Sequence, residues 1–467
     1  MSRTRHIYRA RKPTLEESRD QRRLLVWGDI AQWMVVDAEL ASLLSRFDGK
    51  RPLKRVLRAH AKRWDKPLDQ VSREVEAVLP ALVSRDILTT SRRPVAMEPE
   101  PVSIANLTIN VTNRCNLRCR FCYNAERRTP ELPVERLMDA LRDARPVLDE
   151  GASLILLGGE PLLDLERLLR VLDRAPEAFS TAPMVSTNGT LLTEEAVAAL
   201  AQRRVEVQVS LDGPNPDRHD AGRGVGVFER AVSGVRRLVD AQVHTILSMV
   251  YTSDSLADLS PYLDLALELG VAEARFIPLR LIGGGLGSRD ACPDQRETFE
   301  ALLEILSRRP EARALLARDF FTILYTICRY SARRRSCGIG RRVAFIDADG
   351  AVYPCPNHVA TEYRAGHLSD TPLSAILHDS PVFHEMRRRY DIARYTRCRT
   401  CPFRHWCAGD CRGEVVALTG DPAAPSPHCA ELRRVYADML WLLSEDDPRL
   451  GAAPRSPDAR QALDQFL

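Results

Sequence analysis

The sequence predicts an α/β protein whose centre is a partial barrel of six strand–helix units. A small winged-helix-like α+β domain precedes the barrel, and a cysteine-rich region follows it. Two observations predict this division. Apolar segments of strand length alternate with amphipathic helical segments through the middle of the chain, which is typical of a parallel sheet with right-handed crossovers. The 12 cysteines are unevenly placed, with none before Cys115 and seven between Cys337 and Cys429.

Residues 1–90 are predicted to form the winged-helix-like domain. The segment LLVWGDIAQWMVVD reads as a hairpin around Gly28 and Asp29, and three helical segments follow it: AELASLLSRF, RPLKRVLRAHAKRW and PLDQVSREVEAVLPALVSRD. We expect residues 30–36 to form an edge strand that ends at Asp37, a residue type that caps helices. The stretch 89–102, rich in proline and charge, is predicted to be a linker.

Six strands are expected in the central region, residues 103–290. They are SIANLTINVT, SLILLGG, PMVSTN, VEVQVSL, HTILSMVY and EARFIPLRL, with helical segments such as VERLMDALRDARPVL between them. Parallel sheets bind their ligands at the C-terminal ends of the strands. The segment CNLRCRFCYN directly follows the first expected strand, and its three cysteines therefore fall where a site is expected.

Cys115, Cys119 and Cys122 are candidate metal ligands. Structural zinc needs four ligands, commonly from paired CxxC motifs, and no fourth cysteine or histidine follows nearby. A [4Fe–4S] cluster accepts one thiolate on each of its four irons. Three cysteines leave one iron open to bind a small molecule, so the triplet favours such a cluster over zinc or buried structural thiols.

The segment CNLRCRFCYN resembles the CxxxCxΦC motif of radical S-adenosylmethionine (SAM) enzymes, with Phe121 as the aromatic residue. Three further segments resemble motifs of that family and follow successive expected strands: GGEP at 158–161, STNGT at 186–190, and SLDGP at 210–214 with HD and an arginine after it. The resemblance implies that a 5′-deoxyadenosyl radical removes hydrogen from a substrate. It also implies a set of residues around SAM: Gly158, Gly159, Glu160, Asn188, Ser210 and Arg223. Within this set Glu160 would meet the SAM amino group, Asn188 the ribose, and Ser210 and Arg223 the carboxylate.

The C-terminal region, residues 336–445, carries C-x12-G-x4-C, then CRTCPFRHWCAGDC, then a last cysteine. Its CxxC spacing leaves zinc ribbons as an alternative. The whole pattern resembles the SPASM domain of peptide-modifying radical SAM enzymes, which implies two auxiliary [4Fe–4S] clusters and three clusters in total. The implied ligands are Cys337, Cys355 and Cys411 for the first auxiliary cluster, and Cys398, Cys401, Cys407 and Cys429 for the second. Cys328, within FFTILYTICRY, is either a further ligand of the first cluster or a buried helix residue.

Three stretches carry no assigned chemistry. Residues 291–335 are expected to form bridging helices, and residues 446–467 a loose tail. The glycine-rich GGGLG at 283–287 is too short for a dinucleotide fingerprint, and we expect it to turn the chain near the barrel mouth. No role is assigned to Cys292, which follows this loop.

The N-terminal domain resembles the precursor-recognition domain of peptide maturases, related to the PqqD-like chaperone of pyrroloquinoline-quinone synthesis. The alternative is that this domain only caps the barrel and stabilises it. The resemblance implies that a leader peptide adds as a strand to its sheet edge. Together the resemblances imply a maturase that forms a thioether, C–C or C–O cross-link in a ribosomally made precursor peptide, with an external electron donor such as flavodoxin or ferredoxin. One alternative is a sulfatase maturase that makes formylglycine, although Pro356 stands where many of those enzymes have aspartate. Another is a zinc-binding peptide adaptor without catalysis.

The composition of the chain limits which partners and which cellular compartment we expect. The net charge of +4 gives no support for a nucleic-acid or membrane-surface partner. No apolar run of about 18 residues is present, and the polar N-terminus lacks a signal core. We therefore expect the cytoplasm, where thiols stay reduced.

Overall fold

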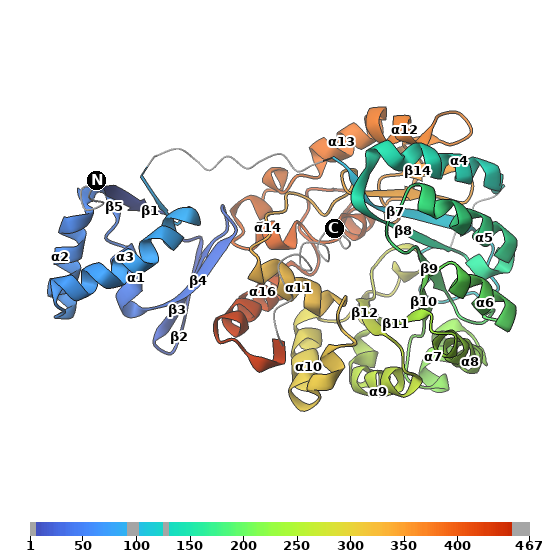
Figure 1. The fold of residues 1–467 in the computed structure, drawn as a ribbon, viewed down its shortest axis with the longest axis horizontal. Helices are drawn as coiled ribbons and strands as arrows, with labels where there is room; N and C mark the ends of the chain where they lie inside the picture. Colours follow the sequence, from blue (N-terminus) through green and yellow to red (C-terminus); the bar gives the residue numbers. More distant parts are fainter. Residues whose placement is uncertain (1–5, 91–101, 125–129, 451–467) are drawn as a thin grey trace.

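The computed structural model describes residues 6–90, 102–124 and 130–450 (Figure 1). Most of the predicted linker at 89–102 and of the predicted tail at 446–467 lies outside the described residues. The described start of that tail is packed and not loose, because it forms a short turn at Pro448–Leu450 in which Leu450 is 2% exposed.

A nine-stranded sheet organises the centre of the molecule, in the order β12-β11-β10-β9-β8-β7-β13-β14-β15. Neighbours from β12 to β13 are parallel, and the last three strands are antiparallel. The six predicted strands are confirmed: β7 (Ile104–Thr112), β8 (Leu148–Gly158), β9 (Met184–Thr187), β10 (Glu206–Ser210), β11 (His244–Tyr251) and β12 (Glu273–Pro278). Beyond β7 the C-terminal region adds β13 (Val343–Ile346), β14 (Ala351–Tyr353) and β15 (Gly366–His367).

Helices connect the parallel strands and pack along the curved sheet (Figure 1). They are α4 (Val134–Ala144), α5 (Leu165–Arg174), α6 (Glu194–Gln202), α7 (Pro216–Arg223), α8 (Val227–Asp240) and α9 (Leu259–Leu269). Each longer helix buries one apolar stripe; α5, for example, buries Leu168, Val171 and Leu172. Helix α7 was not predicted, because its sequence PDRHDAGR has no such stripe and buries only its histidine.

The bridging and C-terminal helices lie outside the barrel, partly between it and the N-terminal region and partly against α4 (Figure 1). They are α10 (Gln295–Arg308), α11 (Phe320–Arg329), α12 (Leu373–Asp379), α13 (Pro381–Arg389), α14 (Arg404–Cys407), α15 (Arg412–Thr419) and α16 (Cys429–Ser444). Helix α16 packs against α10 and α11. Within the described ranges, none of the helices combines the length and the apolar character that a bilayer span requires.

The N-terminal region contains the three predicted helices, α1 (Ala38–Leu44), α2 (Leu53–Trp64) and α3 (Leu68–Ser84), and the predicted hairpin, β3 (Arg22–Trp27) with β4 (Gln32–Asp37). Asp37 caps α1 by accepting a hydrogen bond from Leu40 N at 2.7 Å. The strand β2 (Leu15–Arg19) pairs with β3, which leaves β4 at an edge of this sheet, as predicted. A second small sheet joins β5 (Asp48–Pro52), β1 (Ile7–Ala10) and β6 (Leu88–Thr89).

The sheet β2-β3-β4 lies between two cores. Side chains alternate across a strand, and accordingly Leu24 and Val26 join the main core whereas Leu25 joins the core of the N-terminal helices. Trp33 of β4 also donates a hydrogen bond from Nε1 to the carbonyl oxygen of Cys328 in α11, at 3.0 Å. This sheet therefore attaches the N-terminal region to the C-terminal helices.

Candidate active site

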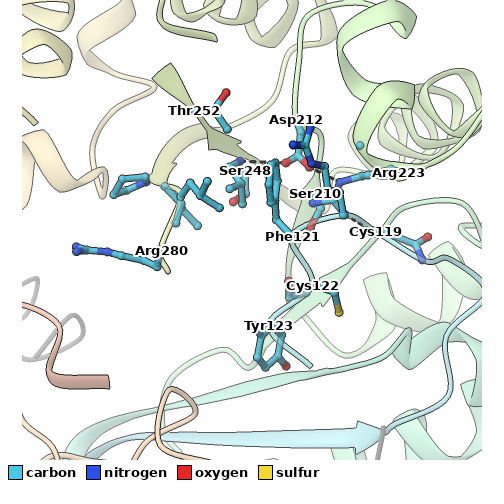
Figure 2. A pocket seen from close by; sticks show the side chains of 18 of the residues that line it. Cys119, Phe121, Cys122, Tyr123, Ser210, Asp212, Arg223, Ser248, Thr252 and Arg280 are labelled. Carbon is cyan, nitrogen blue, oxygen red and sulfur yellow. Dashed lines mark hydrogen bonds and ion pairs between the residues drawn. The ribbon is translucent and has the colours of Figure 1, made fainter. Parts of the chain in front are cut away.

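A cavity of about 600 Å³ opens at the C-terminal ends of the parallel strands (Figure 2). Cys115, Cys119 and Cys122 all line it, on the loop that follows β7. The strand ends of β8 to β12 and the helix α7 supply most of the rest of its wall. The cysteine triplet therefore lies where the parallel sheet predicted a site.

The glycines after β8 hold this cysteine loop in place. Gly159 N donates to Thr112 O at 2.7 Å, and the next backbone amide donates to Arg114 O at 2.8 Å. A Cβ atom on Gly159 would lie 2.1 Å from Arg114 O, and one on Gly158 would lie 2.2 Å from Thr112 O. Only glycine fits such a close approach of two backbones. The GGE segment thus fixes the backbone from which the cysteine loop starts.

The glycine-rich loop after β12 closes the cavity from the other end of the sheet. Gly284 N donates to Cys122 O at 2.9 Å. A Cβ atom on Gly283, whose φ is +50°, would lie 2.6 Å from Tyr123 O. The predicted turn near the barrel mouth is therefore confirmed, and it rests directly on the cysteine loop.

Glu160 lies behind the cavity wall and not in it. Its side chain is fully buried, and its carboxylate accepts hydrogen bonds from Thr187 Oγ1 at 2.6 Å, Asn188 N at 2.8 Å and Leu162 N at 3.1 Å. It is not among the residues that line the cavity. The carboxylate thus ties the end of β8 to the end of β9.

The other predicted SAM contacts do line the cavity: Phe121, Gly158, Gly159, Asn188, Ser210 and Arg223. Asn188 is fixed by its side-chain amide, which donates from Nδ2 to Asn116 Oδ1 at 2.9 Å. Ser210 ends β10 and points into the cavity beside Phe121 (Figure 2). Asn188, Ser210 and Arg223 thus approach the triplet from the ends of β9, β10 and α7.

Arg223 is held by Asp212. Its Nε donates to Asp212 Oδ2 at 2.5 Å, and Asp212 Oδ1 accepts from Val250 N at 3.0 Å (Figure 2). Asp212 therefore joins β10, β11 and the arginine and does not cap a helix; Asn215 caps α7. The Nη1 of Arg223 lies 4.0 Å from the Cys119 sulfur, so a fixed positive charge faces the triplet.

Burial raises the pKa of each of the three thiols in the triplet, and Arg223 partly offsets this effect. Metal ligation requires thiolates, so a bound cation is the partner that would stabilise them here. The donors, the open cavity and the facing arginine fit an iron–sulfur cluster with an anionic small molecule beside it.

The seven C-terminal cysteines are brought together in the two predicted sets. Cys398, Cys401, Cys407 and Cys429 line one cavity of about 410 Å³. In the other set the charges of Cys337 and Cys411 both raise the pKa of Cys355, after the larger effect of burial. Asn357 donates to the Cys411 sulfur at 3.5 Å and also lines the large cavity, which places this set at the cavity wall.

A four-iron cluster and a single zinc ion require different spacings of their thiolates. Four thiolates around one zinc at 2.3 Å lie about 3.8 Å from one another. Across the part of the chain that the structure describes, one group of three or more Cys, His, Asp or Glu side chains has its ligand atoms within 4.8 Å, and it contains none of the cysteines of the three sets. A four-iron cluster binds each thiolate on a separate iron and needs the wider spacing.

Cys328 is fully buried in α11, within the main apolar core. Burial raises the pKa of its thiol, and Arg334 is the charged group that acts on it. Cys328 and Cys407 both act on the pKa of Tyr436, after its burial. Since α11 also contacts α14, which ends at Cys407, the structure places Cys328 near the second set.

Arg280 is a residue of the site that sequence reasoning missed. It follows β12, lines the large cavity, and donates to Asp410 Oδ1 at 3.2 Å and Glu414 Oε2 at 2.9 Å. Since Cys411 lies between these two acids in sequence, Arg280 links the cavity wall to the first C-terminal set. No local sequence motif predicts the contacts of Arg280 with Asp410 and Glu414, because more than a hundred residues separate the arginine from the two acids.

Two segments of the chain match known protein families. Residues 109–266 match the Radical SAM superfamily, and residues 337–402 match SPASM, an iron-sulfur cluster-binding domain. Both lie where the sequence motifs predicted them.

Two curated relatives and one solved structure are similar over most of the chain. AdoMet-dependent heme synthase of Methanosarcina barkeri is 29% identical over 365 residues, covering 72% of this chain and 98% of the relative. Mycofactocin maturase MftC of Mycolicibacterium smegmatis is 31% identical over 332 residues, covering 70% and 82%. The crystal structure of Streptococcus suis SuiB bound to precursor peptide SuiA has a TM-score of 0.55 at 14% identity, covering 91% of this chain and 98% of that chain.

Proposed function

The chain belongs to the radical SAM superfamily with a SPASM domain, and we propose that this enzyme cross-links a ribosomally made precursor peptide. One observation carries the proposal: the chain is 31% identical to a curated relative named as a maturase. A second supports it, because the fold of a peptide-bound radical SAM structure extends over 91% of this chain. A match of this extent includes part of the N-terminal region as well as the barrel.

We assign the SAM cluster to Cys115, Cys119 and Cys122. The first auxiliary cluster is assigned to Cys337, Cys355 and Cys411, and the second to Cys398, Cys401, Cys407 and Cys429. When bound, these groups and SAM supply a radical that removes hydrogen and an acceptor for a second electron. Cys328 is left as a core residue, since its thiol lies in apolar surroundings.

The protein's own part is positioning. Arg223 and Ser210 would hold the SAM carboxylate, Asn188 the ribose, and the backbones of Gly158 and Gly159 would lie against the methionine part. Glu160 acts from behind the wall, by fixing the ends of β8 and β9. Burial of the cavity floor excludes water from a reactive radical.

Formylglycine formation is the sibling alternative. The residue after Cys355 is Pro356, which has no acid–base group, and Asn357 beside it lines the cavity as a neutral amide. An adjacent carboxylate base is therefore missing at this position, and this favours cross-linking. The zinc-binding adaptor has no support from the thiol spacing.

The test is anaerobic incubation of the cluster-replete enzyme with SAM, dithionite and the short peptides encoded beside its gene, followed by tandem mass spectrometry. Loss of two hydrogens with a fragmentation gap between two residues is the expected result. A Cys-to-formylglycine change would establish the sibling reaction instead. Turnover of a tetrapyrrole with no change in any peptide would overturn the proposal.

We propose that the leader of the precursor pairs with the outer edge of β4. Within the described residues β4 is paired on one side only, with β3. Its backbone groups on the other side are free to accept an added strand. Trp33 and Val35 of β4 also pack on the main core, so a bound leader would start next to the catalytic body.

We propose that the electron donor, a small acidic protein such as flavodoxin or ferredoxin, docks over the second auxiliary cluster. Arg397 and Arg433 line the cavity of that cysteine set. They and their neighbours Arg399 and Arg434 are exposed, and no ion pair joins these four to another described residue. Such a patch of uncompensated positive charge attracts an acidic partner.

A further inference from the structure

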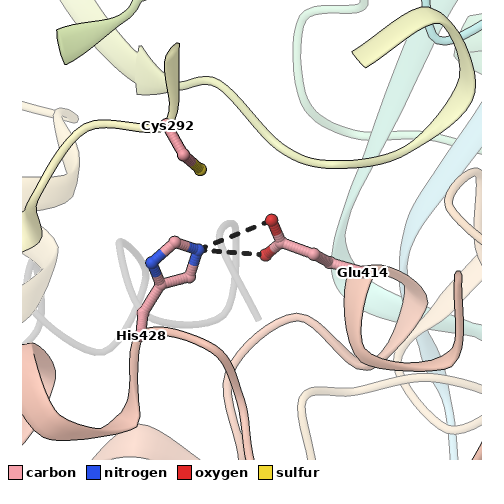
Figure 3. A group of neighbouring side chains, drawn as sticks. All are labelled: Cys292, Glu414 and His428. Atoms are coloured by element: carbon pink, nitrogen blue, oxygen red, sulfur yellow. Dashed lines mark hydrogen bonds and ion pairs between the residues drawn. The ribbon is translucent and has the colours of Figure 1, made fainter. Parts of the chain in front are cut away.

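Cys292, Glu414 and His428 converge on one point (Figure 3). All three ligand atoms, one from each side chain, lie within 4.8 Å of one another. Cys292 comes from the loop after β12, Glu414 from α15, and His428 immediately precedes α16. These residues lie outside the three cysteine sets, and none has a role in the proposed reaction.

Neighbouring groups hold Glu414 and His428 in their orientations. Glu414 is fully buried and its Oε1 accepts from Leu281 N at 2.9 Å. His428 is 5% exposed; its Nε2 faces Glu414 Oε2 at 3.4 Å, while its Nδ1 faces Glu431 Oε2 at 3.7 Å. A carboxylate behind the second ring nitrogen is the usual support of a metal-binding histidine.

The charges around the group also suit a divalent ion. A Cys292 thiolate and the Glu414 carboxylate would together balance two positive charges. Arg280 donates to Glu414 Oε2 at 2.9 Å, but Asp410 pairs with the same guanidinium at 3.2 Å and offsets its charge. The nearby cation therefore leaves Glu414 able to serve as a ligand.

We propose that Cys292, Glu414 and His428 bind one zinc ion. One sulfur, one imidazole nitrogen and one carboxylate oxygen form a donor set that zinc prefers, and three protein ligands leave a fourth position for water or another ligand. The bound ion would join three segments: the cavity wall next to Leu279 and Leu281, the helix that follows Cys411, and the helix that begins with Cys429. It would thus fix the cavity wall against both C-terminal cysteine sets.

The experiment incubates the cluster-replete protein with zinc sulfate, removes loose metal by desalting, and measures zinc by mass spectrometry and zinc-edge X-ray absorption. We expect about one zinc per chain, with one sulfur near 2.3 Å and nitrogen or oxygen near 2.0–2.2 Å. Cys292→Ser and His428→Gln should each lose most of this zinc and keep their iron. The control His384→Gln, on the surface of α13, should keep both.

Two results would overturn the proposal. Absence of tightly bound zinc in the wild-type protein would leave only an ion pair between His428 and Glu414. An all-sulfur zinc environment would place the metal in the cysteine sets instead. Because the absorption measurement needs only the wild-type protein, a variant that fails to fold does not obscure the answer. The readout uses neither SAM nor peptide, and it stands apart from the test of the proposed function.

Discussion

At the scale of single residues, the backbone next to Gly159 leaves no room for a side chain. We predict that Gly159→Ala forces Arg114 and the cysteine loop to shift, because the new Cβ would lie 2.1 Å from a backbone oxygen. Overpacking of this kind costs about 1–3 kcal/mol. Iron content and SAM cleavage by the reconstituted variant should both fall. The control is Gly151→Ala within β8, the strand that Gly159 directly follows, where nothing lies within 4 Å of the added Cβ; equal losses in both variants would argue against the close approach.

Arg223 offers a second test at this scale. Arg223→Lys keeps the charge but loses the planar fork that reaches both Asp212 and the cavity. Losing a charged hydrogen bond costs about 1.5–3 kcal/mol, so we predict that the SAM Kd rises roughly 10- to 100-fold. Iron content should not change. The control Arg203→Lys, in a surface pair with Asp173, should bind SAM normally, and an unchanged Kd in the Arg223 variant would remove it from the site.

The predicted site residues show which parts of the site can be recognised from the sequence alone. The three cysteine sets could be predicted because their spacing is local or follows a known pattern, and the structure gathers them accordingly. Glu160 was expected to meet SAM; its carboxylate accepts hydrogen bonds from Leu162, Thr187 and Asn188 at the ends of β8 and β9, and its contact with SAM stays a prediction. Arg280 and Cys292 could not be predicted, since their partners Glu414 and His428 lie in another region of the chain.

At the scale of elements, the N-terminal ends of β10, β11 and β12 meet at the barrel end opposite the site. Glu273 accepts hydrogen bonds there from His244 at 2.9 Å and from Arg318 at 2.7 Å, and Arg318 also pairs with Glu206. Burial alone would raise the pKa of Glu273, but these partners outweigh burial and lower it to about 2. The network therefore stabilises the barrel and does not take part in catalysis.

We predict that Glu273→Gln lowers the free energy of unfolding by about 2–3 kcal/mol at neutral pH. A lowered carboxyl pKa gives stability that is complete above the unfolded value of 4.5 and is lost only as the pH falls toward 2. The difference between wild type and variant should therefore be the same at pH 7.5 and pH 6, measured by anaerobic denaturant unfolding. A difference that shrinks by half at pH 6 would contradict this assignment. SAM cleavage at low temperature should stay normal.

The strands and helices also differ in how well they could be predicted from the sequence. The six barrel strands and their longer helices were predicted, because a buried parallel strand is almost wholly apolar and a surface helix has one apolar stripe. The strand β2 was missed because LEESR is polar, and its place depends on pairing with β3. The strands β13 to β15 have only two to four residues each, which is too little pattern to show that they extend the central sheet.

At the scale of the whole molecule, the proposed electron donor is an acidic partner protein. We predict that Arg433→Glu slows reduction by an acidic donor protein at low salt by about tenfold or more, because electrostatic steering acts on association. Reduction by dithionite should not change. The control Arg136→Glu, exposed on α4 and absent from the lining of the second set's cavity, should behave as wild type. If both variants slow reduction by the donor to the same extent, the net charge of the protein, and not this surface, determines the reduction rate.

The attachment of the N-terminal region also determines how its function can be tested. Deleting residues 6–90 would remove the proposed leader site, but it would also uncover the core that Leu24 and Val26 now cover. Loss of activity in such a truncation would not separate peptide binding from folding. A change confined to the outer edge of β4 avoids this difficulty.

The register of the sheet identifies that change. The carbonyl of Val26 accepts from Thr14 N at 2.7 Å, on the β2 side. Its partner across the hairpin is Trp33, and backbone groups alternate between the two sides of an antiparallel strand. Trp33 and Val35 therefore direct their N–H groups away from β3, toward the free edge. Proline is tolerated where an edge N–H points outward, so Val35→Pro removes an outer donor and spares the ladder.

We predict that Val35→Pro weakens binding of the full precursor roughly 3- to 10-fold, the effect of losing a backbone hydrogen bond worth about 0.5–1.5 kcal/mol. Binding of a leaderless core peptide should not change, and SAM cleavage should stay intact, because the edge lies outside the catalytic cavity. The control Val35→Thr keeps the N–H and the β-branched shape. The measurement is an anaerobic titration of labelled precursor, with and without its leader, against the three proteins. If Val35→Pro binds the full precursor as tightly as wild type, the leader does not add to β4, and the N-terminal sheet serves only to cover the C-terminal helices.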